Sequence, residues 1–195
     1  MRVLQTVTLL VATLGAGLMA GLFAAFAYAV MPGLGRSADR TFVQAMQNIN
    51  RAIINGWFLL PFLLPIPLLA LATVLAWSGP GQVALPWILA ALVLYLAAFF
   101  VTGGVNVPLN SALDNAALGD GRDGPNTAGS SGSSGSAGGS GGSGAPADRP
   151  GGLKAARESF EGRWVTWNIV RALAHTAAFG TLAWALFLHG TAATG

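Results

Sequence analysis

Cysteine is absent from this chain of 195 residues, which has only two histidines and seven acidic residues. Without cysteine the chain cannot form disulfides, iron–sulfur clusters or thiolate zinc sites, and it cannot carry out thiol redox chemistry. Charged residues make up 9% of the sequence, against roughly 25% in an average soluble domain. The ten Lys and Arg residues outnumber the seven Asp and Glu residues by too little to indicate nucleic-acid binding. A water-soluble globule, a disulfide-rich secreted module and a nucleic-acid-binding protein are all disfavoured.

The few histidines also restrict metal chemistry. If His175 and His189 lie on one helix, the helical rise separates them by about 21 Å, so they cannot share a metal ion. This excludes a two-histidine iron site and a bis-histidine haem within one chain, and it leaves only a haem with the single ligand His175, which no motif supports. The GxGxxG and P-loop motifs of nucleotide sites are missing as well. We therefore expect no metal and no cofactor.

Long apolar stretches are what the sequence does contain. Apolar residues make up 53% of the chain, and a membrane-spanning helix needs about 20 of them in succession. Four stretches predict an all-α, integral membrane four-helix bundle: Val3–Met31, Gly56–Trp77, Val83–Thr102 and Val165–Leu188. The first can also be read as a signal peptide, but its apolar run is nearly twice the usual length of about 7–15 residues, which favours a retained span.

The segment 119–152 interrupts this pattern, because nearly all of its residues are small or polar. Such a composition cannot bury a core and predicts a disordered Gly/Ser-rich linker, either a natural low-complexity insertion or an engineered tether. Residues 1–118 then hold spans one to three and the loop helix. Residues 153–195 hold a pre-span helix and span four of the same bundle.

Basic residues in the loops predict the orientation of the bundle. The short turn after span two carries no basic residue. The loop after span one and the segment before span four are basic, with Arg36, Arg40 and Arg51 in the first and Lys154, Arg157 and Arg163 in the second. By the positive-inside rule, loops one and three are cytoplasmic and both termini lie outside the cell membrane, although Arg2 favours the opposite orientation. One face of span one is built of small residues and suits packing within the bundle or a homodimer: Gly17, Gly21, Ala25 and Ala29.

Loop one predicts a cytoplasmic amphipathic helix that extends span two. An apolar stripe recurs there at helical spacing, at Phe42, Met46, Ile49 and Ile53. The opposite side carries Asn48 and Asn55 among other polar residues. Two interpretations stay open: the helix lies in the headgroup region with its polar side in water, or the polar side turns inward and covers a pocket. In the second, Asn48 and Asn55 contact a ligand.

Polar residues gather at the same end of spans three and four. Asn106 and Asn110 share one face if the helix continues through Pro108, and interhelical hydrogen bonding explains them as well as ligand contact does. One face of span four carries Trp164, Asn168, Arg171 and His175. An arginine in a membrane costs roughly 2.5–3.5 kcal/mol unless it finds a partner, snorkels or lines a wet cavity. Snorkelling does not explain His175, which lies a turn deeper than Arg171 and has a short side chain. Polar residues of the loop-one helix and of spans two, three and four fall at the same end of the bundle, which favours a pocket there.

Four segments occur in a recognisable order: Met31-Pro-Gly-Leu34, Phe42–Asn50, Asn106-Val-Pro-Leu-Asn110 and Phe160–Arg171, the last reading Phe-Glu-x-Arg-Trp-x-x-Trp-Asn-x-x-Arg. With them the chain resembles the anthrone-oxygenase-like family of four-span membrane proteins, over essentially its whole length except the Gly/Ser stretch. Fungal members oxidise anthrones to anthraquinones in polyketide pathways. The resemblance implies a hydrophobic phenolic substrate that enters from the bilayer and reacts with dioxygen at an activated methylene, without a cofactor.

The resemblance also implies roles for residues. His175 would be the base, and Arg171 would stabilise the enolate or peroxide oxygen electrostatically. The side chains expected to orient the substrate or stack on its rings are Asn106, Asn110, Asn168, Trp164 and Trp167. The alternative is a non-catalytic membrane module that binds a lipid or quinone-like ligand, or an accessory subunit of a redox enzyme. Ion transport is a third and weaker interpretation, because no acidic residue lies within a span.

Overall fold

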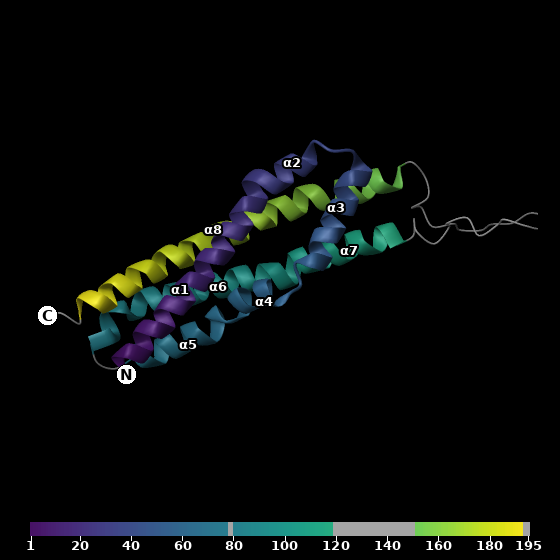
Figure 1. Ribbon diagram of the computed structural model, residues 1–195. Helices are drawn as coiled ribbons and strands as arrows, with labels where there is room; N and C mark the ends of the chain where they lie inside the picture. The colour runs from purple at the N-terminus through teal and green to yellow at the C-terminus, as the bar shows by residue number, and fades with distance from the viewer. Residues whose placement is uncertain (78–79, 119–150, 193–195) are drawn as a thin grey trace, which may run out of the picture.

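The computed structural model describes residues 1–77, 80–118 and 151–192, and its regular elements there are all helical. Four helical rods are long and apolar enough to cross a membrane: Arg2–Gly35, Gly56–Ala76, Gln82–Ala116 and Gly152–Thr191. They lie side by side in an elongated bundle, with the start of the first rod and the end of the last at one end (Figure 1). The predicted all-α bundle of four spans is confirmed, which supports a multi-pass membrane protein.

The predicted linker, residues 119–152, lies outside the described residues except for its last two positions. The second of these, Gly152, is already the first residue of α8 (Gly152–Thr191). The predicted pre-span helix and span four are therefore one helix of 40 residues. At 1.5 Å per residue it is about 60 Å long, roughly twice the thickness of a bilayer's hydrocarbon core.

The first rod consists of α1 (Arg2–Ala25), a π-helical turn (Phe26–Val30) and α2 (Met31–Gly35). α1 packs between α8 and α5 (Pro65–Ala76). A Cβ added to Gly15 would lie 2.7 Å from Cγ of Pro65, so this close approach requires glycine. The predicted small-residue face is looser: a Cβ on Gly17 would meet Phe179 at 3.0 Å, but nothing lies within 4 Å of one on Gly21.

The second rod is broken by proline, as its three prolines predict. α4 (Gly56–Leu63) ends one residue before α5 begins at Pro65. Because Pro65 has no N–H, the carbonyl of Pro61 loses its usual helical partner. The hydroxyl of Tyr95 instead lies 3.0 Å from the carbonyl oxygens of both Pro61 and Phe62. A neighbouring span thus satisfies the backbone groups that the break frees, as an apolar surrounding demands.

The third rod, after a 3-10 turn (Pro80–Ala84), is continuous from α6 (Leu85–Val101) through a π-helical turn (Thr102–Asn106) into α7 (Val107–Leu118). The helix therefore does continue through Pro108, and Asn106 and Asn110 share one face. A π turn skips one position in the hydrogen-bond ladder, which suits a proline that has no N–H to donate.

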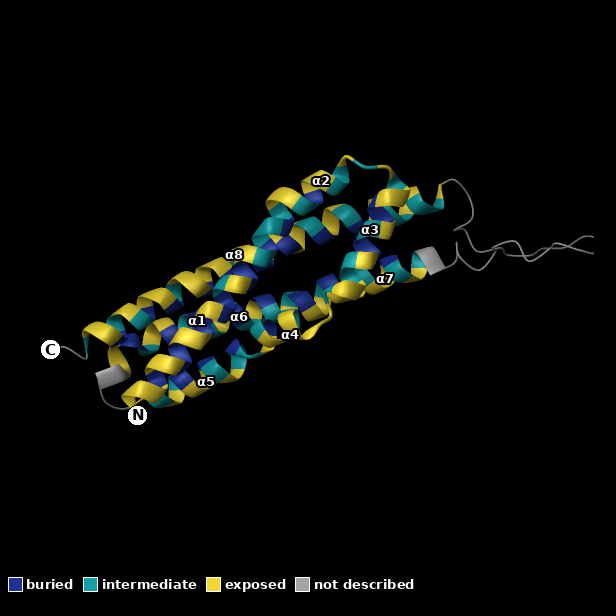
Figure 2. Ribbon diagram, in the orientation of Figure 1, coloured by how far each residue is buried: buried dark blue, intermediate teal, exposed yellow. Residues whose placement is uncertain are grey.

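Buried residues run along the inner faces of the rods (Figure 2). In the half that holds the termini, small residues let the helices approach closely: Ala12, Ala16, Ala72, Ala76, Ala91, Ala178 and Ala185. In the other half the core is aromatic and includes α3 (Asp39–Ala52). Figure 1 shows α3 lying across the protruding parts of α7 and α8.

The prediction that the loop helix extends span two is wrong. α3 ends at Ala52, and Asn55 adopts an extended backbone conformation with φ −138°. The side-chain oxygen of Asn55 accepts a hydrogen bond from the backbone N–H of Phe58 at 3.1 Å, so Asn55 caps α4. This break lets α3 turn away from span two and pack its apolar side into the bundle.

Arg157 of α8 anchors the corner between α2 and α3. Its guanidinium makes hydrogen bonds of 2.7–3.0 Å to four groups: the carbonyls of Gly35 and Ser37 and the carboxylates of Asp39 and Glu161. It also lies 4.6 Å from the centroid of the Phe42 ring. The start of α3 is thereby held against α8.

Arg157→Ala should lower the free energy of unfolding by at least about 2 kcal/mol, because each hydrogen bond to a charged group contributes about 1.5–3 kcal/mol. Thermal unfolding in detergent measures the effect. The matched control is Lys154→Ala, because Lys154 makes one ion pair of 3.8 Å with both side chains about two-thirds exposed. Equal melting temperatures for the two variants would contradict the anchoring role.

Candidate functional site

A cavity of about 210 Å³ lies between the end of α1, the end of α3, the start of α4, α7 and α8. Four aromatic side chains form much of its wall: Phe23, Phe26, Phe58 and Trp164. Its polar lining is supplied mainly by α3, α7 and α8: Asn50, Arg51, Thr102, Asn106, Asn110, Ser111, Asp114 and Arg171. Polar residues of three helices therefore meet at one end of the bundle, and the arrangement suits a flat ligand with a few oxygen atoms.

Both π-helical turns border this cavity. Phe26 begins the first turn, and Thr102 and Asn106 begin and end the second. All three side chains line the cavity. A π turn widens a helix locally and changes which residues share its inner face, and such turns are frequent at functional sites. Here they bring a hydroxyl and an amide to the same wall.

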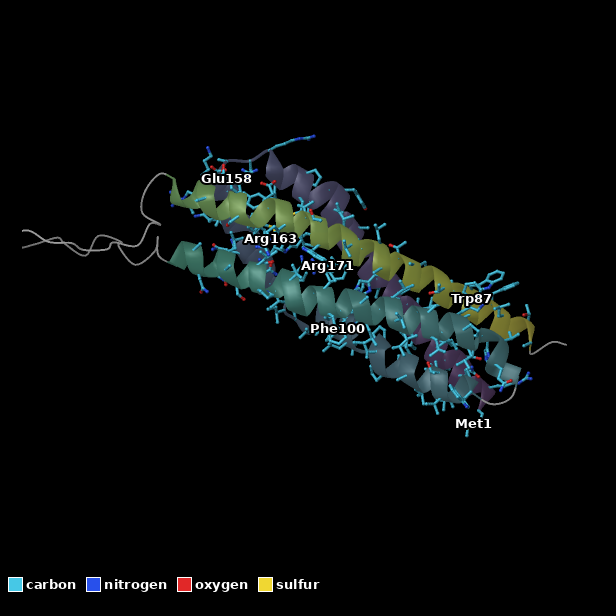
Figure 3. All side chains as sticks on the ribbon, turned by 180° about the vertical axis from the view of Figure 1, so that it is seen from behind. Met1, Trp87, Phe100, Glu158, Arg163 and Arg171 are labelled. Atoms are coloured by element: carbon cyan, nitrogen blue, oxygen red, sulfur yellow. The ribbon has the colours of Figure 1, made fainter. Side chains whose placement is uncertain are left out.

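Arg171 brings a cation into the aromatic part of the cavity. Its side chain is only 6% exposed, and Figure 3 shows it between α8 and the α6–α7 rod. Its Cζ atom lies 4.1 Å from the ring centroid of Phe23 and 5.1 Å from that of Trp164. Among the described residues no carboxylate lies within 4.0 Å of this guanidinium. Ring faces stabilise the cation without neutralising it, so it can attract an anionic oxygen.

Asn168 holds Arg171 in place from behind the cavity. Its Oδ1 atom accepts a hydrogen bond from Nε of Arg171 at 3.1 Å, and its Nδ2 atom donates to the carbonyl of Phe23 at 3.1 Å. Asn168 is fully buried and does not line the cavity. The structure thus brings Asn168 to the site as a positioning residue and does not place it against a ligand.

The asparagines of the third rod combine the two interpretations that the sequence left open. Asn106 donates to the carbonyl of Trp164 at 3.4 Å, and Asn110 accepts from the indole N–H of Trp164 at 2.8 Å. Both also line the cavity. Oδ1 of Asn106 and Nδ2 of Asn50 are buried without a hydrogen-bond partner, and a buried amide group without a partner is costly. An acceptor and a donor are therefore free to meet ligand atoms.

His175 lies one turn deeper and is not among the lining residues. Its ring is fully buried, 5.1 Å from the Phe23 ring and 4.6 Å from the Tyr95 ring. Both ring nitrogens lack a hydrogen-bond partner. Phe23 contacts the cavity on one side and His175 on the other, so the imidazole does not reach the cavity in this conformation. In the described part of the chain, no group of three or more His, Cys, Asp or Glu residues could hold a metal ion.

Three predicted site residues lie away from the cavity. Asn48 is exposed on α3, because the opposite side of that helix packs into the bundle. Asn55 is exposed and caps α4. Trp167 is 38% exposed and points outward from α8. Of the polar side of α3, Asn48 therefore does not reach the pocket, whereas Arg51 lines it. The apolar side of α3 turns inward and carries Asn50 to the cavity.

Sequence reasoning missed several lining residues, and some of them left a signal. Asp114 follows Asn110 by four residues, so the spacing that predicted the two asparagines also indicated Asp114. Asn50 follows the buried residues Met46 and Gln47 at helical spacing. Phe23 and Phe58 left no signal, because an apolar side chain within a span looks the same whether it lines a cavity or contacts lipid.

Comparison with known proteins gives a family. A family model described as anthrone oxygenase matches residues 52–181, which is more than half of the chain. This match includes the segments 106–110 and 160–171, whereas the segments 31–34 and 42–50 precede it. Searches of curated proteins and of solved structures gave no match. By this match, which covers most of its last three spans, the protein belongs to the anthrone oxygenase family.

Proposed function

We propose that this protein oxidises a hydrophobic, planar phenolic substrate with dioxygen inside the cavity. The observation that carries the proposal is the buried guanidinium of Arg171, which lies between aromatic rings at the cavity wall and pairs with no carboxylate of the described residues. A methylene between aryl rings and opposite a carbonyl loses a proton to give an enolate, whose negative charge rests on oxygen. A preorganised cation beside that oxygen lowers the barrier to its formation.

The substrate can supply all the electrons that this oxidation needs. The methylene loses two hydrogens and four electrons and becomes a carbonyl. Dioxygen accepts the four electrons, and one of its oxygen atoms enters the carbonyl while the other leaves as water. The scheme requires a base, an oxyanion site and a water-poor pocket that admits dioxygen.

The remaining lining residues fit the task of orienting such a substrate. The rings of Phe23, Phe58 and Trp164 offer flat apolar walls. The unpartnered amide atoms of Asn50 and Asn106 can bind phenol or carbonyl groups. Substrate that has dissolved in the bilayer would enter laterally between the spans.

The cavity end of the bundle faces the cytoplasm in this proposal. Figure 1 places α3, the end of α7 and the start of α8 together at the end away from the termini. The basic residues of loop one and of the segment before span four are therefore gathered at one end. This arrangement supports the predicted orientation with loops one and three inside and both termini outside.

Oxygen consumption by the purified protein in detergent tests the function. With a panel of anthrones and related phenols, we expect repeated turnover at one dioxygen per substrate, and we expect a chelator to leave the rate unchanged. Uptake that the chelator abolishes would instead reveal a required metal ion. No uptake above the buffer rate for any compound would favour a non-catalytic binding or accessory role, and ligand titration would then test saturation at one molecule per chain.

A further inference from the structure

Asp114 on α7 lines the same cavity as Arg171, and no other carboxylate among the described residues does so. We propose that Asp114 is the general base that takes the proton from the substrate's methylene. This inference rests on the proposed function. It assigns the base of that reaction to a residue outside the family segments 106–110 and 160–171. The resemblance had implied His175 for this role.

The carboxylate of Asp114 is held by Arg51, which comes from α3. Nη2 of Arg51 lies 3.0 Å from Oδ1, and its Nε lies 3.5 Å from Oδ2. The side chains of Arg51 and Asp114 are 55% and 33% exposed, so the pair adds little to stability. It does orient the carboxylate. A carboxylate can accept about four hydrogen bonds, so lone pairs remain free to accept a proton.

The position of Asp114 relative to Arg171 fits the chemistry of the substrate class. Asn110 and Asp114 follow each other by one helical turn, about 6 Å along α7. Asn110 is bonded to the indole of Trp164, and the guanidinium of Arg171 lies over that indole. Trp164 therefore stands between the cation and the carboxylate along the cavity wall.

An anthrone-like substrate has its carbonyl and its methylene at opposite positions of the central ring. An enzyme that stabilises the oxygen and deprotonates the carbon therefore needs its cation and its base at opposite edges of the ring. A ligand that lies in the cavity alongside Trp164 would have Arg171 toward one edge and Asp114 toward the other. His175 lies behind Phe23, on the far side of the cation from Asp114.

The proposed steps balance. Asp114 takes one methylene proton, and the electron pair of the C–H bond moves into the enolate beside Arg171. The enolate passes an electron to dioxygen, and the carbon–oxygen bond forms to give a peroxide. Protonated Asp114 returns its proton to the peroxide oxygen. Asp114, ionised again, then removes the second methylene hydrogen as a proton. The electron pair of that C–H bond forms the carbonyl as the O–O bond breaks, and the departing hydroxide takes up the proton to leave as water.

Proton exchange without oxygen isolates the base step. The purified protein is incubated anaerobically with anthrone in heavy water, and exchange of the methylene protons is followed by NMR above a protein-free blank. Asp114→Asn should lower the exchange rate and the oxygen uptake by about 10²- to 10³-fold, which is the usual contribution of a general base. Asp114→Glu, which keeps the carboxylate, should retain more than a tenth of both rates. Glu158→Gln, at an exposed carboxylate on α8, should change neither.

Each outcome separates the base assignment from the proposed function. Exchange by Asp114→Asn at the rate of the unmodified protein would overturn the assignment, and loss of exchange in His175→Phe with retention in Asp114→Asn would move the base to His175. Exchange without oxygen uptake in the unmodified protein would support the base and overturn the oxidation. Absence of both reactions would overturn both. If Asp114→Asn does not fold, a folded Asp114→Glu that has lost exchange entirely overturns the assignment.

Discussion

Arg171→Met should lower kcat/KM for anthrone oxidation by about 10²- to 10³-fold, which is the usual cost of removing one preorganised group from an oxyanion site. Methionine fills much of the same volume but carries no charge, so the enolate oxygen would lose its cation. Among the described residues no carboxylate pairs with the buried Arg171, so removing its charge relieves a desolvation cost. This gain offsets the lost hydrogen bond to Asn168, and the melting temperature should change little. Oxygen uptake and thermal unfolding of the same preparation measure the two effects.

Two further variants make this prediction specific to the buried guanidinium. Arg171→Lys keeps the charge but loses the planar group that stacks between Phe23 and Trp164. Its kcat/KM should therefore lie between that of the unmodified protein and that of Arg171→Met. Arg163→Met removes an exposed arginine from the same helix and should leave the rate within twofold. If Arg171→Met kept its rate within threefold of the unmodified protein, the oxyanion role of Arg171 would be wrong.

Trp164→Ala should destabilise the bundle by about 3–5 kcal/mol, as is usual when a large aromatic side chain is removed from a core. The Trp164 ring is 2% exposed and contacts the rings of Phe26 and Phe160. It also bonds Asn110 and lies under Arg171. Its loss should therefore open the cavity wall and abolish oxygen uptake. Denaturant or thermal unfolding in detergent measures the stability.

The second tryptophan of the motif is the natural control. Trp167→Ala removes a side chain that is 38% exposed and points away from the cavity, so both stability and turnover should change little. Trp164→Phe keeps an aromatic ring, although a smaller one, and loses the hydrogen bond to Asn110, which by itself should cost about 1 kcal/mol. Equal losses in Trp164→Ala and Trp167→Ala would show that α8 responds to the removal of any tryptophan and would remove the specific role of Trp164.

The sequence predicts the spans well, because the length of an apolar run is dictated by the thickness of a bilayer. It does not show how far each helix continues beyond the lipid. α8 begins at Gly152 and not near Val165, since its first turns are covered by α3 and need no apolar run. The break at Asn55 depends on one capping hydrogen bond, which outweighs the helical pattern of the surrounding residues.

Helical spacing found part of the polar lining of the cavity and missed the rest of it, together with most of the apolar lining. Trp164, Arg171 and the two asparagines of the third rod line it as predicted, because polar side chains within a span turn inward. Asn48 was placed on the wrong side, since α3 packs by the face that also carries Asn50. The sequence also does not show how deep in the bundle the cavity ends. His175 shares a helix face with Arg171, but the packing of Phe23 separates it from the cavity.

The length of α8 has a consequence for any kinetic study of this protein. Apart from Arg171, the charged residues of α8 occupy its first dozen positions, and Arg171 follows the last of these, Arg163, by eight residues, or about 12 Å. We therefore expect the cavity to lie near the surface of a bilayer, within reach of the lipid-soluble substrate of the proposed function. The occupancy of the cavity then depends on the mole fraction of substrate in the lipid, and not on its molar concentration in the whole sample. Added detergent would dilute the substrate in two dimensions and raise the apparent KM while the turnover number stayed constant.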